Sequence, residues 1–87
     1  MALGFPNRSR SYDARRNLIR FWGHDSALEI SFFVEVAALR KLCSQTMDDE
    51  AAYLAAFETV RDRIHDAARS AYSRTQKDVY LLAATDF

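Results

Sequence analysis

Residues 17–34 read NLIRFWGHDSALEISFFV, and this stretch decides the fold. Two runs rich in branched and aromatic residues flank a polar segment, which is the pattern of two β-strands joined by a turn. We therefore predict a β-hairpin that turns at Gly23–Ser26 and places Trp22 opposite Ala27. A slip of one residue would exchange the two faces of each strand and pair charged with apolar side chains, so the assignment of faces is strongly specified.

The two faces of this hairpin differ in chemistry. One face is apolar and is expected to point at a layer of helices; it carries Ile19, Phe21, Leu28, Ile30, Phe32 and Val34. The other face is mixed and carries Leu18, Arg20, Trp22, Glu29, Ser31 and Phe33. In the predicted register Phe21 faces Leu28 on the apolar face, and Arg20 faces Glu29 on the mixed face.

Length and composition indicate one ordinary globular domain. The chain has 87 residues, of which 49% are hydrophobic and 28% charged, so residues 1–87 are expected to form a single domain. No apolar run approaches a membrane span, and the first residues lack the basic and apolar regions of a signal peptide. The chain has a single cysteine, which excludes an internal disulfide and a thiolate metal cluster. A cytoplasmic location is the expectation.

The segments around the hairpin complete an α+β domain. The predicted ranges are a loosely ordered arm at 1–11, strands within 12–34, a helix at 35–44, a helix at 47–73 and a strand at 77–84. A short N-terminal edge strand at Ser11 and Tyr12 makes the order β-β-β-α-α-β. This order predicts two layers, an antiparallel sheet with two α-helices packed on one face.

The second helix has the clearest pattern. Thr46 and Asp49 have the spacing of a capping box, and the acidic residues that follow suit the positive end of the helix dipole. Apolar residues then recur at steps of four and three, from Tyr53 through Phe57 and beyond Val60. This stripe predicts one continuous helix.

Charge is balanced in total but segregated along the chain. Residues 1–22 hold five arginines and one aspartate, a net charge of +4, whereas residues 48–66 hold two arginines and six acidic residues, a net charge of −4. In the first interpretation these regions meet within the fold or lie on opposite surfaces. In the second, a basic arm made of Arg8, Arg10, Arg15 and Arg16 binds nucleic acid. The neutral total favours the first, and nucleic acid is not the expected partner.

No assembled catalytic or metal-binding group is visible in the sequence. His24, Asp25 and Ser26 have the residue types of a hydrolase triad, but side chains adjacent in a tight turn rarely reach that geometry. The two histidines and Cys43 lack metal-ligand spacing, and two glycines do not make a phosphate loop. We expect no metal, no cofactor and no enzyme activity. An enzyme would need distant groups such as His24 and His65 to converge.

The mixed hairpin face is the candidate interaction surface. It is defined by Leu18, Arg20, Trp22, Glu29 and Phe33. Aromatic residues and arginine are enriched at protein interfaces, so the leading hypothesis is a non-enzymatic protein-interaction or self-associating module. The alternatives are that Phe5, Tyr12 or Phe87 covers this face, and that it binds a ligand.

Several segments together resemble a known family. They are Phe5-Pro-Asn, Ser11-Tyr-Asp13, Ile19-Arg-Phe-Trp-Gly-His-Asp-Ser26, Phe32-Phe-Val34 and the helix from Ala55-Ala-Phe57 to Arg61-Asp-Arg-Ile64. In order and spacing they resemble the small proteobacterial proteins grouped as domain of unknown function 1488. The resemblance implies a compact α+β domain in a bacterial cytoplasm. It supplies no catalytic residue, cofactor or partner.

Overall fold

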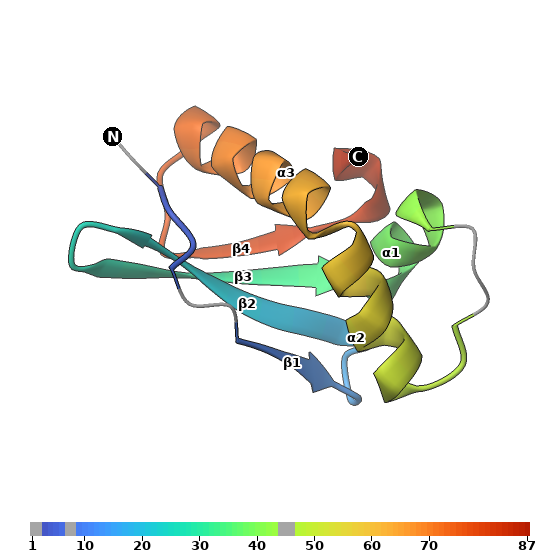
Figure 1. The fold of residues 1–87 in the computed structure, drawn as a ribbon. Coiled ribbons are helices and arrows are strands. Elements are labelled where there is room, and N and C mark those ends of the chain that lie inside the picture. Colours follow the sequence, from blue (N-terminus) through green and yellow to red (C-terminus); the bar gives the residue numbers. More distant parts are fainter. Residues whose placement is uncertain (1–2, 7–8, 44–46) are drawn as a thin grey trace.

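The computed structural model describes residues 3–6, 9–43 and 47–87, and it shows a sheet covered by helices on one face (Figure 1). The elements are β1 (Arg10–Asp13), β2 (Leu18–Asp25), β3 (Leu28–Glu35), α1 (Val36–Leu42), α2 (Glu50–Thr59), α3 (Arg61–Arg74), β4 (Val79–Leu82) and a final 3-10 turn (Ala84–Asp86). The sheet order is β1-β2-β3-β4. The predicted α+β architecture with two layers is confirmed.

The direction of the last strand differs from the prediction. β1, β2 and β3 are antiparallel neighbours, but β4 pairs with β3 in parallel, so the sheet is mixed rather than antiparallel. After β3 the chain passes through α1, α2 and α3 before it re-enters the sheet. This crossover returns the chain to the end of the sheet where β3 begins, and β4 must then run in the direction of β3.

The hairpin turns later than predicted. The turn lies at Ser26 and Ala27, with Asp25 opposite Leu28, and Ser26 adopts a left-handed φ of 56°. The predicted turn at Gly23–Ser26 and the pairing of Trp22 with Ala27 are therefore wrong. The observed register differs from the predicted one by an even number of residues, so each side chain stays on the face predicted for it.

Gly23 explains the shift, because it is a buried position within β2 rather than part of the turn. A Cβ at Gly23 would lie 3.0 Å from Leu3 Cδ1, 3.0 Å from Phe5 Cε1 and 3.1 Å from Phe32 Cε2. The glycine is thus needed for close packing of the N-terminal segment on the strand.

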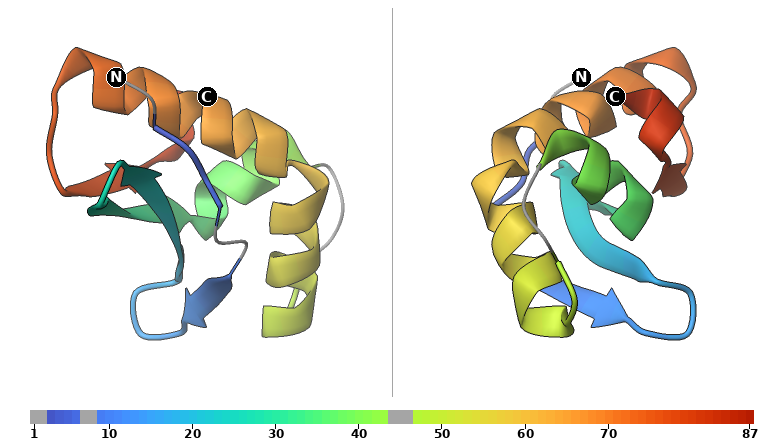
Figure 2. Two further views of the ribbon diagram at one scale, coloured as in Figure 1. Left: turned by 60° about the vertical axis from the view of Figure 1, so that its left-hand side comes forward. Right: turned by 90° about the vertical axis from the view of Figure 1, so that its right-hand side faces the viewer.

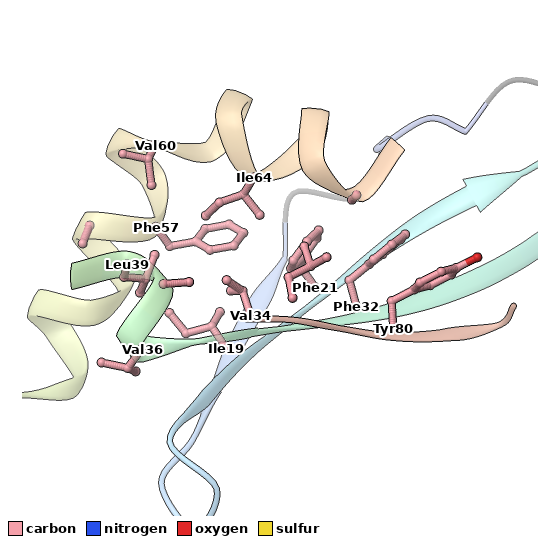
Figure 3. Packing of buried hydrophobic residues seen from close by; sticks show 14 of the residues in the cluster. Ile19, Phe21, Phe32, Val34, Val36, Leu39, Phe57, Val60, Ile64 and Tyr80 are labelled. Atoms are coloured by element: carbon pink, nitrogen blue, oxygen red, sulfur yellow. The ribbon is translucent and has the colours of Figure 1, made fainter. Parts of the chain in front are cut away.

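The core lies between the sheet and the helices (Figure 3). The predicted apolar face supplies Ile19, Phe21, Ile30, Phe32 and Val34, all with 0–1% of their surface exposed. Phe32 stacks between Phe21 and Tyr80, with ring centroids 5.3 and 5.1 Å away. Leu28 is the exception to the predicted set. It is 54% exposed because it adjoins the hairpin turn.

The predicted helix at 47–73 is divided in two at Val60, whose φ of −111° and ψ of 19° end α2 before α3 begins. A straight helix of that length would be roughly 40 Å long, whereas the longest extent of the domain is 37 Å. The bend lets α2 contact β1 while α3 contacts β4 (Figure 2). Asp49 caps α2 by accepting a hydrogen bond from Ala52 N–H, and the predicted cap, Thr46, lies outside the described residues.

Leu3 and Phe5 hold the N-terminal segment against the core, and residues 10–11 belong to β1, so the expected loose arm at 1–11 is wrong for residues 3–6 and 10–11. Leu3 is buried, and Gly4 exchanges two backbone hydrogen bonds of 2.8 Å with His24. Phe5 stacks on His65 with ring centroids 3.9 Å apart, and the guanidinium of Arg69 lies 5.1 Å from the Phe5 ring. These contacts fix the segment between β2 and α3.

Candidate interaction face

The sheet has a second face that turns away from α2 and α3, which we call the open face. Strand alternation places on it Ser11, Asp13, Leu18, Arg20, Trp22, His24, Glu29, Ser31, Phe33, Glu35, Val79 and Leu81. In the views of Figures 1 and 2 no described helix crosses this face. Phe5, Tyr12 and Phe87, considered as possible covers, all pack against the core instead.

The centre of the open face is a stack of arginine and aromatic side chains. The guanidinium of Arg20 lies 4.9 Å from the ring centre of Trp22 and 5.8 Å from that of Phe33. Arg16 approaches Phe33 from the β1–β2 turn, at 5.0 Å. Both rings are partly buried. Cation–π contacts of this kind hold the side chains in a fixed arrangement.

The charge of Arg20 is not balanced by a neighbouring carboxylate. Within the described residues no carboxylate oxygen forms an ion pair with Arg20, whose Nη2 donates only to the Ser31 hydroxyl at 3.2 Å. Its Nε is shielded from solvent and has no described hydrogen-bond partner. The predicted pairing with Glu29 is wrong, because the true register places Glu29 opposite His24 and Phe33 opposite Arg20.

The β1–β2 turn carries the other cations of this region. Asp13 accepts hydrogen bonds from the backbone N–H groups of Arg15 and Arg16, and its Oδ2 lies 2.9 Å from Arg16 Nε. The side-chain hydrogen bond from Arg16 lowers the pKa of Asp13 below its ordinary value of 3.8. An open hollow of about 540 Å³ is lined by Asp13, Arg15 and Arg16. Arg16 therefore links this hollow to the aromatic stack.

Aliphatic side chains extend the open face over β4. Val79 and Leu81 are 53% and 55% exposed, whereas Tyr80 and Leu82 between and after them are buried. The register places Val79 beside Ser31 and Leu81 beside Phe33. Sequence reasoning did not include these two residues in the site, although alternation along the predicted strand was a usable signal.

The structure separates the other residues predicted for the site. Leu18 is only 8% exposed, so its side chain contributes little accessible surface. Arg10 Nε forms an ion pair with Glu58 of α2 at 2.7 Å, which joins the basic and acidic regions of the sequence within the fold. Arg10 and Arg16 thus do not form one basic patch, and Arg8 lies outside the described residues.

The residue types of a triad are not assembled. Ser26 lies in the turn, and Asp25 Oδ2 accepts a hydrogen bond of 2.7 Å from the Tyr72 hydroxyl. This bond, more than burial, raises the pKa of Tyr72 to about 12. Over residues 3–6, 9–43 and 47–87 no group of three histidine, cysteine or acidic side chains could hold a metal ion. Cys43 is buried, with its Sγ 3.9 Å from the Ala56 carbonyl oxygen.

None of the described helices combines the length and apolar character needed to cross a membrane.

No curated protein matches the chain. A crystal structure at 1.60 Å resolution of a protein of unknown function from the DUF1488 family of Shewanella loihica PV-4 has the same fold, with a TM-score of 0.77 and 17% identity over 90% of this chain and 89% of that one. The family described as "Protein of unknown function (DUF1488)" matches residues 3–82. This chain belongs to the DUF1488 family.

Proposed function

We propose that this chain is a non-enzymatic protein-contact module and that the open face is its contact surface. The observation that carries the proposal is the composition of that face. Helices cover one side of the sheet, while the other presents Trp22, Phe33, Val79 and Leu81 around Arg20. A sheet face exposed to water normally carries polar residues throughout, so the aromatic and aliphatic cluster at the centre of this face and over β4 favours burial against a partner.

The energetics support contact with another protein. Val79 and Leu81 are about half exposed, so burying the remaining surface of each would contribute roughly 1 kcal/mol. Trp22 is a large aromatic residue of the type that dominates interface energies. All these side chains project from a hydrogen-bonded sheet, and a rigid surface loses little conformational entropy on binding.

Two matched surface variants test the proposal. Leu81 and Leu28 have the same side chain and nearly the same exposed fraction, 55% and 54%. Leu28, however, lies beside the hairpin turn and on the opposite face of the sheet. Wild-type protein, Leu81→Ser and Leu28→Ser are immobilised and exposed to extract from the native host, and retained proteins are quantified by mass spectrometry. Light scattering gives the solution mass of each variant, and thermal unfolding checks that each is folded.

The proposal predicts that wild type and Leu28→Ser retain the same partner, or the same oligomer, and that Leu81→Ser loses it. Identical retained proteins and identical masses for all three chains would contradict the use of the open face.

A further inference from the structure

We infer that the partner of the open face presents an acidic segment of polypeptide, in which one carboxylate pairs with Arg20 and neighbouring apolar side chains cover β4. This inference rests on the proposed function and specifies the chemistry of the partner. Its basis is the environment of one side chain, Arg20, together with what lies on either side of it.

In the described structure the Arg20 side chain has N–H donors without an acceptor and forms no ion pair. A guanidinium carries five N–H donors, and in the described structure the only hydrogen bond from this side chain goes to the uncharged hydroxyl of Ser31. Nη1 makes no hydrogen bond to a described residue, and Nε is shielded from solvent and has no described partner. Two aromatic rings, Trp22 and Phe33, flank the charge and reduce its contact with water. A carboxylate is the group that pairs best with a guanidinium in such a setting, because charge-assisted hydrogen bonds are the strongest available.

The surroundings of Arg20 define the rest of the partner. Arg20, Phe33 and Leu81 stand in one row across β2, β3 and β4. Adjacent strands are about 4.8 Å apart, so Arg20 and Leu81 are separated by roughly 10 Å. A segment of three or four extended residues spans that distance. It can therefore place a carboxylate on Arg20 and an apolar side chain on Leu81.

A nucleic acid would also bring anions, but the face suits it less well. Single-strand binders use aromatic rings as platforms on which bases stack. Here a guanidinium already lies over each ring, from Arg20 on Trp22 and from Arg16 and Arg20 on Phe33. On the β4 side of the stack the exposed surface is aliphatic, at Val79 and Leu81, and those two side chains offer a phosphate backbone no donor. The polypeptide is the better match.

The test uses three defined probes with the intact chain. They are a capped octapeptide with two glutamates alternating with leucine and valine, the same peptide with glutamine in place of both glutamates, and a short single-stranded oligonucleotide of mixed sequence. Trp22 is the single tryptophan of the chain, so its emission reports binding at the open face directly. Calorimetry gives the affinities.

The expected result is that wild-type protein binds the acidic peptide roughly tenfold more tightly than the glutamine peptide. Arg20→Gln should abolish this preference. Arg20→Lys should restore only part of it, because an ammonium lacks the planar fork of a guanidinium. Leu81→Ser should weaken both peptides by the same factor, because it removes apolar contact and leaves the charge in place. Thermal unfolding of each variant confirms that it is folded.

Three results would overturn the inference. Equal affinity for the two peptides, with Leu81→Ser weakening both, would leave the protein-contact function standing and remove the role of the carboxylate. If neither peptide binds, but Leu81→Ser still loses the partner in the capture experiment, the partner has another chemistry. Tighter binding of the oligonucleotide, lost on Arg20→Gln, would identify the anion as phosphate.

Discussion

Replacing Gly23 by alanine should destabilise the protein, because the new methyl group has no room. It would lie 3.0 Å from Leu3 Cδ1 and Phe5 Cε1 and 3.1 Å from Phe32 Cε2, whereas carbon atoms in ordinary contact are about 3.5–4.0 Å apart. Overpacking a core typically costs about 1–3 kcal/mol. Loss of glycine flexibility in the unfolded chain returns about 0.4–1 kcal/mol. The net expectation is a loss of roughly 1–2 kcal/mol in the free energy of unfolding, or roughly 5–15 °C in Tm.

The assay is urea unfolding followed by circular dichroism, and the other glycine provides the control. A Cβ at Gly4 would meet nothing within 4 Å, and neither glycine has a positive φ. Gly4→Ala should therefore be neutral or stabilising by up to about 1 kcal/mol. If Gly23→Ala is as stable as wild type, Leu3 and Phe5 do not pack on this strand and the account of the N-terminal segment is wrong.

Three further predictions concern single groups. The hydrogen bond to Asp25 raises the pKa of Tyr72 to about 12. The contribution of this hydrogen bond to stability is therefore complete below pH 10 and is lost as the pH rises through 12. The difference in unfolding free energy between wild type and Tyr72→Phe should shrink over that range. Arg16 lowers the pKa of Asp13, so the contribution of the Asp13 carboxylate to stability is present above pH 3.8 and is lost on acidification. The unfolding free energies of wild type and Asp13→Asn should therefore converge towards about pH 2 in an acid titration. The buried thiol of Cys43 should react with a disulfide reagent roughly a hundredfold more slowly in the folded protein than in denaturant, and equal rates would contradict its burial.

The faces of the hairpin could be predicted from the sequence, whereas its register could not. Period-two alternation assigns Phe21 and Phe32 to one side in any register shifted by an even number, so the core was correct apart from Leu28. The turn was misplaced because Gly23 looks like a turn residue in isolation. Its true role depends on Leu3 and Phe5, which are distant in sequence and pack against it only in the folded chain.

The division of the long helix and the direction of β4 also depend on tertiary structure. Tyr53, Phe57, Val60 and Ile64 are all buried, so the apolar stripe continues across the bend without a signal in the sequence. The bend reflects the size of the domain rather than a local breaker. The same crossover sets β4 parallel to β3, and no residue of β4 encodes that direction.

The candidate site was predicted in part. Arg20, Trp22 and Phe33 were identified from alternation and do meet on the open face. Alternation within the predicted last strand indicates that Val79 and Leu81 share a face, but their place beside Ser31 and Phe33 depends on the crossover, which the sequence does not show. The partner predicted for Arg20 was wrong because the register shift replaces Glu29 with Phe33, and that shift is the reason why Arg20 lacks a carboxylate within the described fold.

The most direct test of the open face is an amide chemical-shift map of the isotopically labelled chain. The protein retained in the capture experiment is added in steps or, if the chain associates with itself, its concentration is raised. The account predicts that the largest shifts fall on the outward positions of β2, β3 and β4, with Arg20, Trp22, Phe33 and Leu81 among them. Shifts concentrated on the exposed sides of α2 and α3, with these four residues unchanged, would contradict it.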